Sequence, residues 1–176
     1  MSLAFEFLGW PDEGPTLRLD YRSFAYAGKF VMSSTGKAVA REDGEVVAAL
    51  AFNADRTDPS TCWLRYVTVR EDRRGEGIGP RLIAFALSEV DERYERVRIA
   101  VNNPFAYEAL YKVGFGFIGN ETGIAELVLA RPPPDCRSAD RYRDGLDRFR
   151  ERELSDAEER FLAAREGASP PPVGGT

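Results

Sequence analysis

Eight consecutive residues, Arg73–Pro80, combine two arginines with three glycines at alternate positions. Glycine has no Cβ, so the backbone at Gly75, Gly77 and Gly79 can adopt positive φ angles and approach a ligand closely. Pro80 suits the first turn of a helix, where its missing N–H would be unpaired anyway. A helix that begins here directs several unpaired N–H groups and the positive end of its dipole at one place. The segment is therefore predicted to bind an anion, most often a phosphate.

The residues around this turn predict a strand before it and a helix after it. Cys62–Val69 is apolar and rich in β-branched and aromatic residues, and Arg81–Tyr94 has apolar residues at helical spacing. Neither of two familiar phosphate loops fits, because Gly79 is followed by Pro80 instead of Lys-Ser/Thr and because G-x-G-x-x-G lacks its third glycine. The alternative to a phosphate site is a tight connection with no ligand.

The rest of the chain predicts a mixed sheet with helices on it. Strands are expected at 4–8, 36–41, 45–52, 62–69, 96–102, 115–119 and 124–129, and a second helix follows Asn103 as its N-cap. The apolar face of this helix is predicted to consist of Phe105, Ala106, Ala109, Leu110 and Val113. Asp43-Gly44 marks a hairpin between two of these strands. Thr16–Met32 fits a strand or a helix equally well. The order hairpin, β-α-β, helix, hairpin predicts an α/β (α+β) fold with a mostly antiparallel sheet.

Three regions are predicted: a main domain at 1–131, a charged helical extension at 132–166 and a disordered tail at 167–176. The first boundary is the run Arg131-Pro132-Pro133-Pro134, and the tail is rich in proline and glycine. Helices are expected at Ala139–Glu153 and Asp156–Arg165, the second with a Ser-x-x-Glu capping box. Their apolar stripe is narrow, so they must pack either on the main domain or on a partner chain.

Composition excludes several kinds of chemistry. The chain of 176 residues has no histidine, which rules out Ser-His-Asp and Cys-His catalysis and removes the commonest metal ligand. Cys62 and Cys136 are too few for a zinc site or a disulfide framework and indicate reduced thiols in the cytoplasm. A net charge of −5 argues against nucleic-acid binding. No apolar run reaches the length of a membrane span, and no signal peptide opens the chain.

Two motifs in this order resemble the GNAT acetyltransferase superfamily. Arg74, Gly77 and Gly79 match R-x-x-G-x-G, the pyrophosphate-binding motif of that superfamily. An asparagine, a short helix and Tyr111-x-x-Gly-Phe match its second signature. The distance from Asn103 to Tyr111 is one residue longer than expected for the family, so either Asn102 or Asn103 is the motif asparagine. The resemblance covers roughly residues 38–131.

The resemblance implies a GNAT-like sheet with a splayed parallel strand pair that holds acetyl-CoA, with no metal. Pantetheine would bind the backbone of one strand, where the N–H of Val67 or Thr68 is the candidate donor to the thioester carbonyl. The Arg74 side chain would lie near phosphate. The cofactor-binding residues carried over are Tyr66, Val67, Thr68, Val69, Arg74, Gly75, Glu76, Gly77, Ile78, Gly79, Pro80, Asn102 and Asn103.

Tyr111 is the candidate general acid, because a phenol with a pKa of about 10 stays protonated at neutral pH and can donate to a leaving thiolate. The alternatives are a packed aromatic residue without a chemical role and a role for Tyr107 on the same helix. No general base is identified. Carboxylates that could reach the site are Glu6, Asp20, Glu121 and Glu126, and a relay through water would serve equally well.

These inferences predict an N-acetyltransferase that moves an acetyl group from acetyl-CoA to a primary amine of a small molecule or peptide. The first alternative is a catalytically silent CoA-binding sensor or interaction module, because no carboxylate lies on the predicted strand. The second is an unrelated α/β domain for another phosphate ligand. We expect no nucleic-acid or membrane partner; a homodimer is compatible with the fold, although no residue specifies one.

Overall fold

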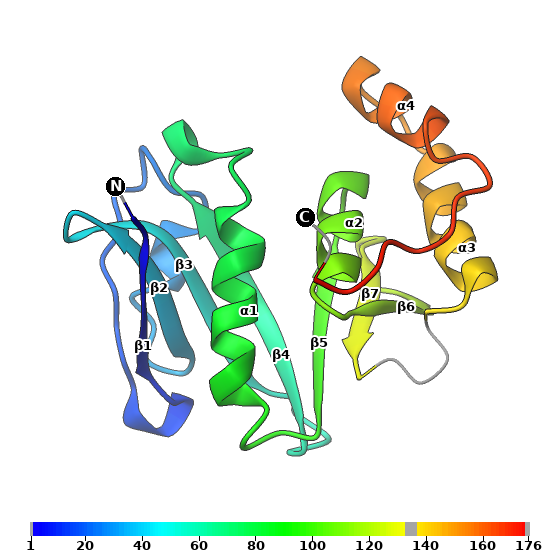
Figure 1. Ribbon diagram of the computed structural model, residues 1–176. Helices are drawn as coiled ribbons and strands as arrows, with labels where there is room; N and C mark the ends of the chain where they lie inside the picture. The colour runs from blue at the N-terminus through cyan, green and yellow to red at the C-terminus, as the bar shows by residue number, and fades with distance from the viewer. Residues whose placement is uncertain (1, 133–136, 175–176) are drawn as a thin grey trace. The chain divides into compact units, whose positions relative to one another are not determined.

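The computed structural model describes residues 2–132 and 137–174 (Figure 1). The chain divides into two compact units, Met1–Val97 and Arg98–Thr176. The described residues form a mixed α/β fold, with seven strands in a mostly antiparallel sheet that includes one parallel pair, and with four α-helices. This is the predicted fold class. None of the helices in the described part of the chain is long and apolar enough to cross a membrane.

The first unit contains an antiparallel run of four strands. They are β1 (Ala4–Gly9), β2 (Gly36–Glu42), β3 (Glu45–Ala54) and β4 (Thr61–Val69), in this spatial order. The turn between β2 and β3 has positive φ at Asp43 (52°) and Gly44 (81°), which is the geometry that Asp-Gly favours in a two-residue hairpin. The predicted hairpin is confirmed.

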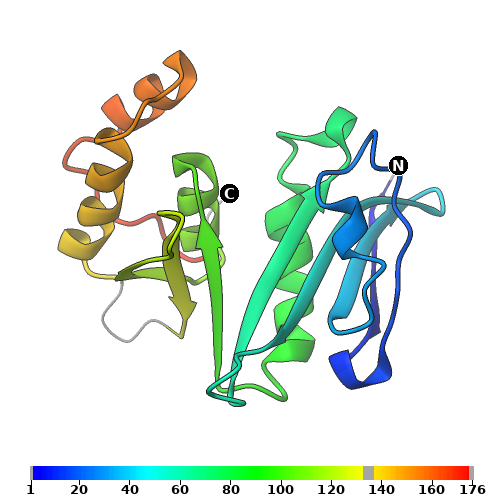
Figure 2. The same cartoon turned by 180° about the vertical axis from the view of Figure 1, so that it is seen from behind.

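The two faces of these strands are covered by different segments. Helix α1 (Ile78–Val90) lies on one face, where a Cβ added to Gly79 would stand 3.5 Å from Cγ2 of Val69. The segment between β1 and β2 covers the opposite face (Figure 2). Its side chains Leu17 and Leu19 pack against a buried cluster that includes Phe30 and Ala51. Side chains of β4 therefore alternate between the helix side and the loop side.

Residues 16–32, which fitted a strand or a helix, form neither. Within this part of the chain the structure has only the 3-10 turn η2 (Ala27–Lys29), and the backbone closes through Leu17 N–H donating to Phe30 O at 2.8 Å. The segment is fastened by Lys37, which is fully buried on β2. Its ammonium donates to Pro15 O (2.5 Å), Met32 O (2.7 Å), Thr35 O (3.0 Å) and Thr35 Oγ1 (2.9 Å). Hydrogen bonds from the buried Lys37, which lies outside the irregular segment, thus hold both ends of that segment.

Helix α1 begins three residues earlier than the predicted Arg81 and ends at Val90 instead of Tyr94. Its N-cap is Gly77, whose φ of 78° allows the helix to begin at the next residue, Ile78. Pro80 is the third helical residue, a position that needs no N–H donor. The predicted apolar face is confirmed for Ile83, Ala86, Leu87 and Val90, which are all buried, whereas Tyr94, which was also expected on it, lies beyond the end of the helix and is half-buried.

The second unit places β7 (Leu127–Arg131) between β5 (Arg96–Val101) and β6 (Gly116–Glu121). Strand β5 begins in the last two residues of the first unit. Three helices accompany these strands: α2 (Pro104–Lys112), α3 (Ala139–Arg150) and α4 (Asp156–Ala163). The capping box at the start of α4 is present, with Ser155 and Glu158 each bonded to the other's backbone N–H.

The last two helices pack on their own chain, which decides between the two alternatives for them. The buried residues of α3 are Tyr142, Gly145, Leu146 and Phe149, so the predicted stripe is its inward face. Ring contacts join Tyr142 to Tyr107 and Tyr111 of α2, at centroid distances of 5.8 and 4.9 Å. The extension is therefore part of the hydrophobic core of the second unit.

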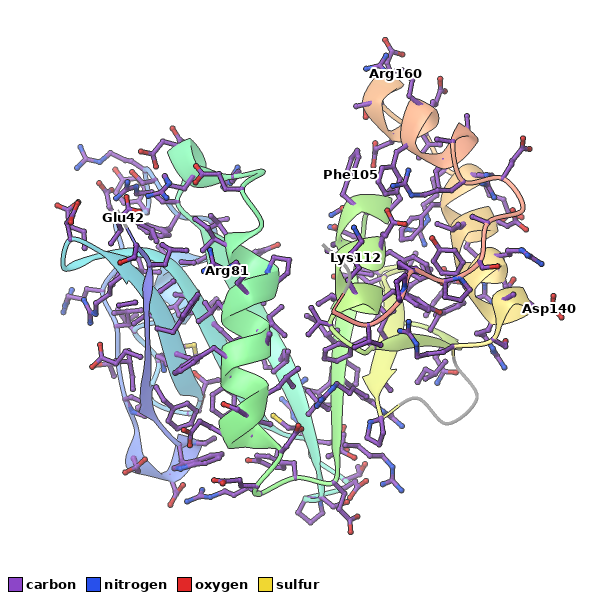
Figure 3. All side chains as sticks on the ribbon, in the orientation of Figure 1. Glu42, Arg81, Phe105, Lys112, Asp140 and Arg160 are labelled. Atoms are coloured by element: carbon purple, nitrogen blue, oxygen red, sulfur yellow. The ribbon has the colours of Figure 1, made fainter. Side chains whose placement is uncertain are left out.

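The inward face of α2 agrees with the predicted one at Leu110, which is buried, but not at Phe105. Phe105 was expected to be part of it but is 44% exposed, whereas Tyr107 and Tyr111 are both fully buried. Figure 3 shows Phe105 and Lys112 at opposite ends of this helix. The prediction was wrong because α3 covers the side of α2 that carries the tyrosines, and local spacing does not reveal where a distant helix will dock.

The division into two units falls between Val97 and Arg98, whereas the domain boundary predicted from the prolines falls after Arg131. That boundary remains a prediction. Pro133, Pro134 and Cys136 lie outside the described residues. Carbonyls in the segment predicted to be disordered accept hydrogen bonds from arginines of the second unit. Arg143 donates to Gly167 O and Ala168 O at 3.0 Å, and Arg137 donates to Pro171 O at 2.6 Å.

Candidate functional site

The glycine turn leaves β4 through the 3-10 turn η3 (Glu71–Arg73) and enters α1. Gly75 and Gly77 have φ angles of 83° and 78°, which L side chains rarely adopt. A Cβ built on either residue would meet nothing within 4 Å. The positive φ angles and the open space together leave a stretch of backbone that a ligand can approach.

The beginning of α1 adds donors to this turn. The first N–H that finds an acceptor within the helix is that of Arg81, which donates to Gly77 O at 3.3 Å. The N–H groups of Ile78 and Gly79 precede it and have no intrahelical acceptor, and Pro80 has no N–H. These donors and the positive end of the helix dipole favour an anion at this position.

The two adjacent arginines have different surroundings. Arg73 pairs with Glu42 at the end of β2 (2.8 Å) and with Glu76 inside the turn (3.0 Å). Figure 3 shows Glu42 at the β2–β3 hairpin. Arg74 is exposed, and its Nε donates to Val69 O at 3.4 Å. Arg74 therefore supplies a cation that no described carboxylate neutralises, as a phosphate contact requires.

The pairing of β4 with β3 decides between the two candidate backbone donors. Arg70 N–H donates to Val47 O at 2.8 Å, and the register pairs Thr68 with Ala49. In an antiparallel ladder, hydrogen-bonded pairs alternate with non-bonded pairs. Thr68 N–H is therefore used in the bond to β3, whereas the N–H of Val67 points away from β3. Of the two predicted donors, only Val67 keeps its N–H out of this ladder.

A β-bulge lies just before this stretch. The register of β4 shifts between the partners Ala51 and Phe52, so Arg65 is the extra residue. Its side chain is held on the surface by a 2.7 Å bond from Nε to Asn53 Oδ1. Beyond the bulge, Thr68 is 3% exposed, and its Oγ1 has no hydrogen-bond partner among the described residues. Bulges bend a strand locally, so Tyr66–Val69 leaves the bulge in a new direction.

The structure distinguishes Asn102 from Asn103 by their roles. Asn103 is the N-cap of α2, and its Oδ1 accepts from Ala106 N–H at 2.9 Å, as predicted for that position. Asn102 is exposed, and its Oδ1 accepts from Asn103 Nδ2 at 3.2 Å. The side-chain oxygen of Asn103 therefore caps helix α2, whereas the side-chain amide of Asn102 is exposed at the surface.

Tyr111, the candidate acid, lies inside the aromatic core of the second unit. Its hydroxyl oxygen accepts from Phe117 N–H at 2.9 Å and lies 3.4 Å from the Tyr107 hydroxyl. The Tyr107 hydroxyl itself donates to Tyr142 O at 3.0 Å. Burial, with the nearby Tyr111 as a smaller cause, raises the pKa of Tyr107 well above its usual value. Both phenols thus have structural partners, and the acid role of Tyr111 remains a prediction.

Cys62, the cysteine among the described residues, is a poor candidate for an enzyme nucleophile. Burial raises the pKa of Cys62 to about 12, so this thiol stays protonated at neutral pH and is a poor nucleophile. Cys136 lies outside the described residues. Within those residues, no three His, Cys, Asp or Glu side chains gather closely enough to ligate a metal. The described residues therefore fit direct attack by a substrate better than a covalent intermediate on cysteine.

The carboxylates that were considered as bases have surface partners. Glu6 pairs with Arg41 at 2.9 Å, Asp20 with Arg22 at 3.1 Å, and Glu121 with Arg148 at 3.1 Å. The Arg22 hydrogen bond holds the pKa of Asp20 below its usual value. Glu126 accepts from Thr122 Oγ1 at 3.4 Å. Asp20 is thus a weaker base than an isolated carboxylate.

The sequence-predicted site residues fall in both units. The first holds Tyr66–Val69 and Arg74–Pro80, which are joined through η3 and through the contact of Gly79 with Val69. The second holds Asn102, Asn103 and Tyr111. Sequence reasoning missed the pairing of Arg73 with Glu42, because the two residues are 31 positions apart and no local pattern links them.

Comparison of the sequence with protein-family profiles identifies one family. The profile of the acetyltransferase (GNAT) family matches residues 3–117. No curated protein shows significant sequence similarity to the chain. Among solved structures, one assigned as a phosphinothricin N-acetyltransferase has a TM-score of 0.55 at 21% identity, covering 74% of this chain and 98% of that one.

Two other structures have the same fold. Nourseothricin acetyltransferase has a TM-score of 0.53 at 16% identity and covers 76% of this chain and 100% of its own. An IAA acetyltransferase from Bacillus cereus has a TM-score of 0.50 at 21% identity and covers 73% and 98%. These likenesses concern the fold, whereas the family profile spans most of the chain. The protein whose glycine turn joins β4 to α1 therefore belongs to the GNAT acetyltransferase family.

Proposed function

We propose that this protein is an acetyl-CoA-dependent N-acetyltransferase whose glycine turn binds the pyrophosphate of the cofactor. One observation carries the proposal: Gly75 and Gly77 combine positive φ with open space beside the N-terminus of α1. A pyrophosphate needs several donors at one place, and here the N–H groups of Ile78 and Gly79 supply them. Arg74 adds a charge that no described carboxylate cancels. The residues present therefore fit the group.

In this proposal the chain polarises the thioester through its backbone. The N–H of Val67 donates to the carbonyl oxygen, because Thr68 N–H is committed to β3. The amine nitrogen attacks the carbonyl carbon, the new N–C bond forms and the C–S bond breaks. The amine loses one proton, and the departing sulfur takes one up. A fixed backbone donor needs no particular side chain, which is why residue types alone could not identify it.

Two proton transfers remain to be assigned. Tyr111 is the proposed acid for the departing sulfur. Its oxygen already accepts from Phe117 N–H, and such a bond stabilises the phenolate left after proton donation. For deprotonation of the amine we propose water, because β4 carries no carboxylate and the surface carboxylates Glu6, Asp20 and Glu121 are paired with arginines.

We expect Tyr111→Phe to separate the catalytic role of this residue from its structural role. Without the hydroxyl, the buried Phe117 N–H loses its acceptor, so the free energy of unfolding should fall by about 1–2 kcal/mol whatever the chemistry. If Tyr111 is also the acid, kcat should fall about 100-fold or more while KM for acetyl-CoA changes little. Denaturant unfolding and steady-state kinetics measure the two effects. Full kcat in a folded variant would remove Tyr111 from the acid role.

The proposed acceptor is a primary amine of a small molecule or a peptide. Acetyl-CoA is an intracellular metabolite, and for this reason we also propose a cytoplasmic location. Release of CoA thiol from acetyl-CoA across a panel of amines, amino acids and peptides tests the activity. Thiol release that depends on one class of amine supports the enzyme and identifies its acceptor class.

Two observations favour a second function. Strand β4 carries no carboxylate, and Tyr111 is fully buried. These features suit a CoA-binding sensor or interaction module that no longer transfers the acetyl group. The same panel distinguishes the two functions. Tight binding of acetyl-CoA without thiol release on any amine favours the module over the enzyme.

A further inference from the structure

We propose that Arg73 is a positioning residue for the glycine turn, and that it also holds Glu76 and offsets its charge so that the turn can accept an anion. The inference rests on the proposed function, because it concerns the same pyrophosphate site. It assigns different tasks to two adjacent arginines: Arg74 contacts the ligand, and Arg73 prepares the loop. The argument has a geometric part and an electrostatic part.

The geometric part is a two-pronged link between the turn and the sheet. Nη1 of Arg73 donates to Glu42 Oε1 at 2.8 Å, and Nη2 donates to Glu42 Oε2 at 3.3 Å. Both side chains are only 18% exposed, so water competes weakly for these bonds. Bidentate arginine–carboxylate pairs fix orientation as well as distance. The beginning of the glycine turn is thereby held against the last residue of β2.

The link matters because the turn cannot hold its own shape. Gly75 and Gly77 have more backbone freedom than any other residue type, and Cβ atoms at these positions would touch nothing. Ordering such a segment costs conformational entropy, which a ligand would otherwise have to offset on binding. A loop held in advance by Arg73 and Glu42 spares the ligand that cost.

The electrostatic part concerns Glu76, which lies between Gly75 and Gly77 and is therefore inside the proposed anion site. An unpaired carboxylate there would repel a pyrophosphate. Nε of Arg73 donates to both oxygens of Glu76, at 3.1 and 3.0 Å. The hydrogen bonds that Arg73 donates to Glu76 and then to Glu42 raise the pKa of Arg73, so the guanidinium stays charged. Arg73 thus holds the one carboxylate of the turn and offsets part of its charge, because the guanidinium pairs with Glu42 as well as with Glu76.

The test measures CoA binding by isothermal titration calorimetry in four proteins: wild type, Arg73→Gln, Glu76→Gln and Arg73→Gln/Glu76→Gln. We expect Arg73→Gln to weaken binding about tenfold, because it frees Glu76 and loosens the turn. Removing the Glu76 charge in that background should restore most of the loss, to within about threefold of wild type. Glu76→Gln alone should bind CoA at least as tightly as wild type.

The suppression distinguishes this inference from a purely structural role. If Arg73 only stabilised the fold, removing its second partner would not restore binding. Salt screens the repulsion between Glu76 and the pyrophosphate. The ratio of the CoA affinities of wild type and Arg73→Gln should therefore shrink at high potassium chloride concentration. Arg70→Gln is the matched control. It removes an arginine that pairs with Asp72 and Glu45 close to the turn, and we expect CoA affinity within about twofold of wild type.

Three results would overturn the inference. They are wild-type affinity in Arg73→Gln, no recovery in the double variant, or an equal loss in Arg70→Gln. If Arg73→Gln does not fold, Glu42→Gln cuts the geometric link alone and should weaken binding about threefold; unchanged affinity in that variant would contradict the link. Failure of the proposed function is recognised separately, because the wild type would then bind neither CoA nor acetyl-CoA.

Discussion

Lys37→Met is expected to lower the free energy of unfolding by about 3 kcal/mol. The ammonium of Lys37 is fully buried and donates to four oxygens, three of them main-chain carbonyls at the two ends of the segment that covers the sheet. Methionine fills a similar volume but donates nothing, so Thr35 would keep two buried acceptors without donors, and Pro15 and Met32 would lose the donor to their half-buried carbonyls. The gain from no longer burying a charge offsets part of this loss. Urea unfolding followed by circular dichroism measures the difference.

Lys29→Met is the matched control for this change. Lys29 belongs to the same segment and undergoes the same chemical substitution, but it is exposed, and its ammonium makes a cation–π contact with the Tyr66 ring at 5.7 Å. We expect its cost to stay below about 1 kcal/mol. Burial also lowers the pKa of Lys37. Raising the pH toward that pKa removes the charge, so the free-energy cost of burying the ammonium should become smaller at high pH. Equal stability losses in the two variants would contradict the anchor role of Lys37.

Gly145→Ala is expected to destabilise the protein by about 2 kcal/mol, against the usual direction of this substitution. A glycine-to-alanine change inside a helix normally stabilises by roughly 0.5–1 kcal/mol. Here the added Cβ would lie 2.5 Å from Cζ of Tyr107 and closer still to its hydroxyl. Tyr107 is fully buried, and its hydroxyl donates to Tyr142 O at 3.0 Å. Either α3 moves away from α2 or Tyr107 loses this bond.

The control is Gly123→Ala, in the same unit. A Cβ at Gly123 meets nothing within 4 Å, and its φ does not lie in the left-handed region. We expect no loss of stability in this variant. Thermal melts of both proteins measure the difference. A Gly145→Ala protein as stable as wild type would show that α3 does not pack on Tyr107 as closely as the structure describes.

Local sequence patterns predicted the elements that depend on neighbouring residues. Asp43-Gly44 specified its hairpin because few residues other than Gly, Asn and Asp adopt positive φ readily. Asn103 and Ser155 specified helix starts because their side chains cap the helix within three residues. The glycine turn of Arg73–Pro80 was recognisable for the same reason. Its residue types are needed for a backbone shape that the chain adopts locally.

Features that depend on distant residues were not predictable in this way. Residues 16–32 fitted a strand and a helix equally well but form neither. The two ends of this segment are held by hydrogen bonds from Lys37, a residue of the following strand, which no pattern within the segment reveals. The inward face of α2 was assigned to Phe105 because nothing near it announces that α3 would cover Tyr107 instead. The choice of Val67 over Thr68 as donor required the register of β4 on β3.

The most direct test of the account is calorimetric titration of acetyl-CoA into wild type, Gly77→Asp and Gly44→Asp. Both glycines have positive φ and open space around a Cβ, so the two variants carry the same backbone strain and the same added charge. Only Gly77 lies in the proposed pyrophosphate site. We predict saturable binding by wild type and by Gly44→Asp, and no measurable binding by Gly77→Asp. Wild-type affinity in Gly77→Asp, or no binding by the wild type, would contradict the assignment of this turn to acetyl-CoA.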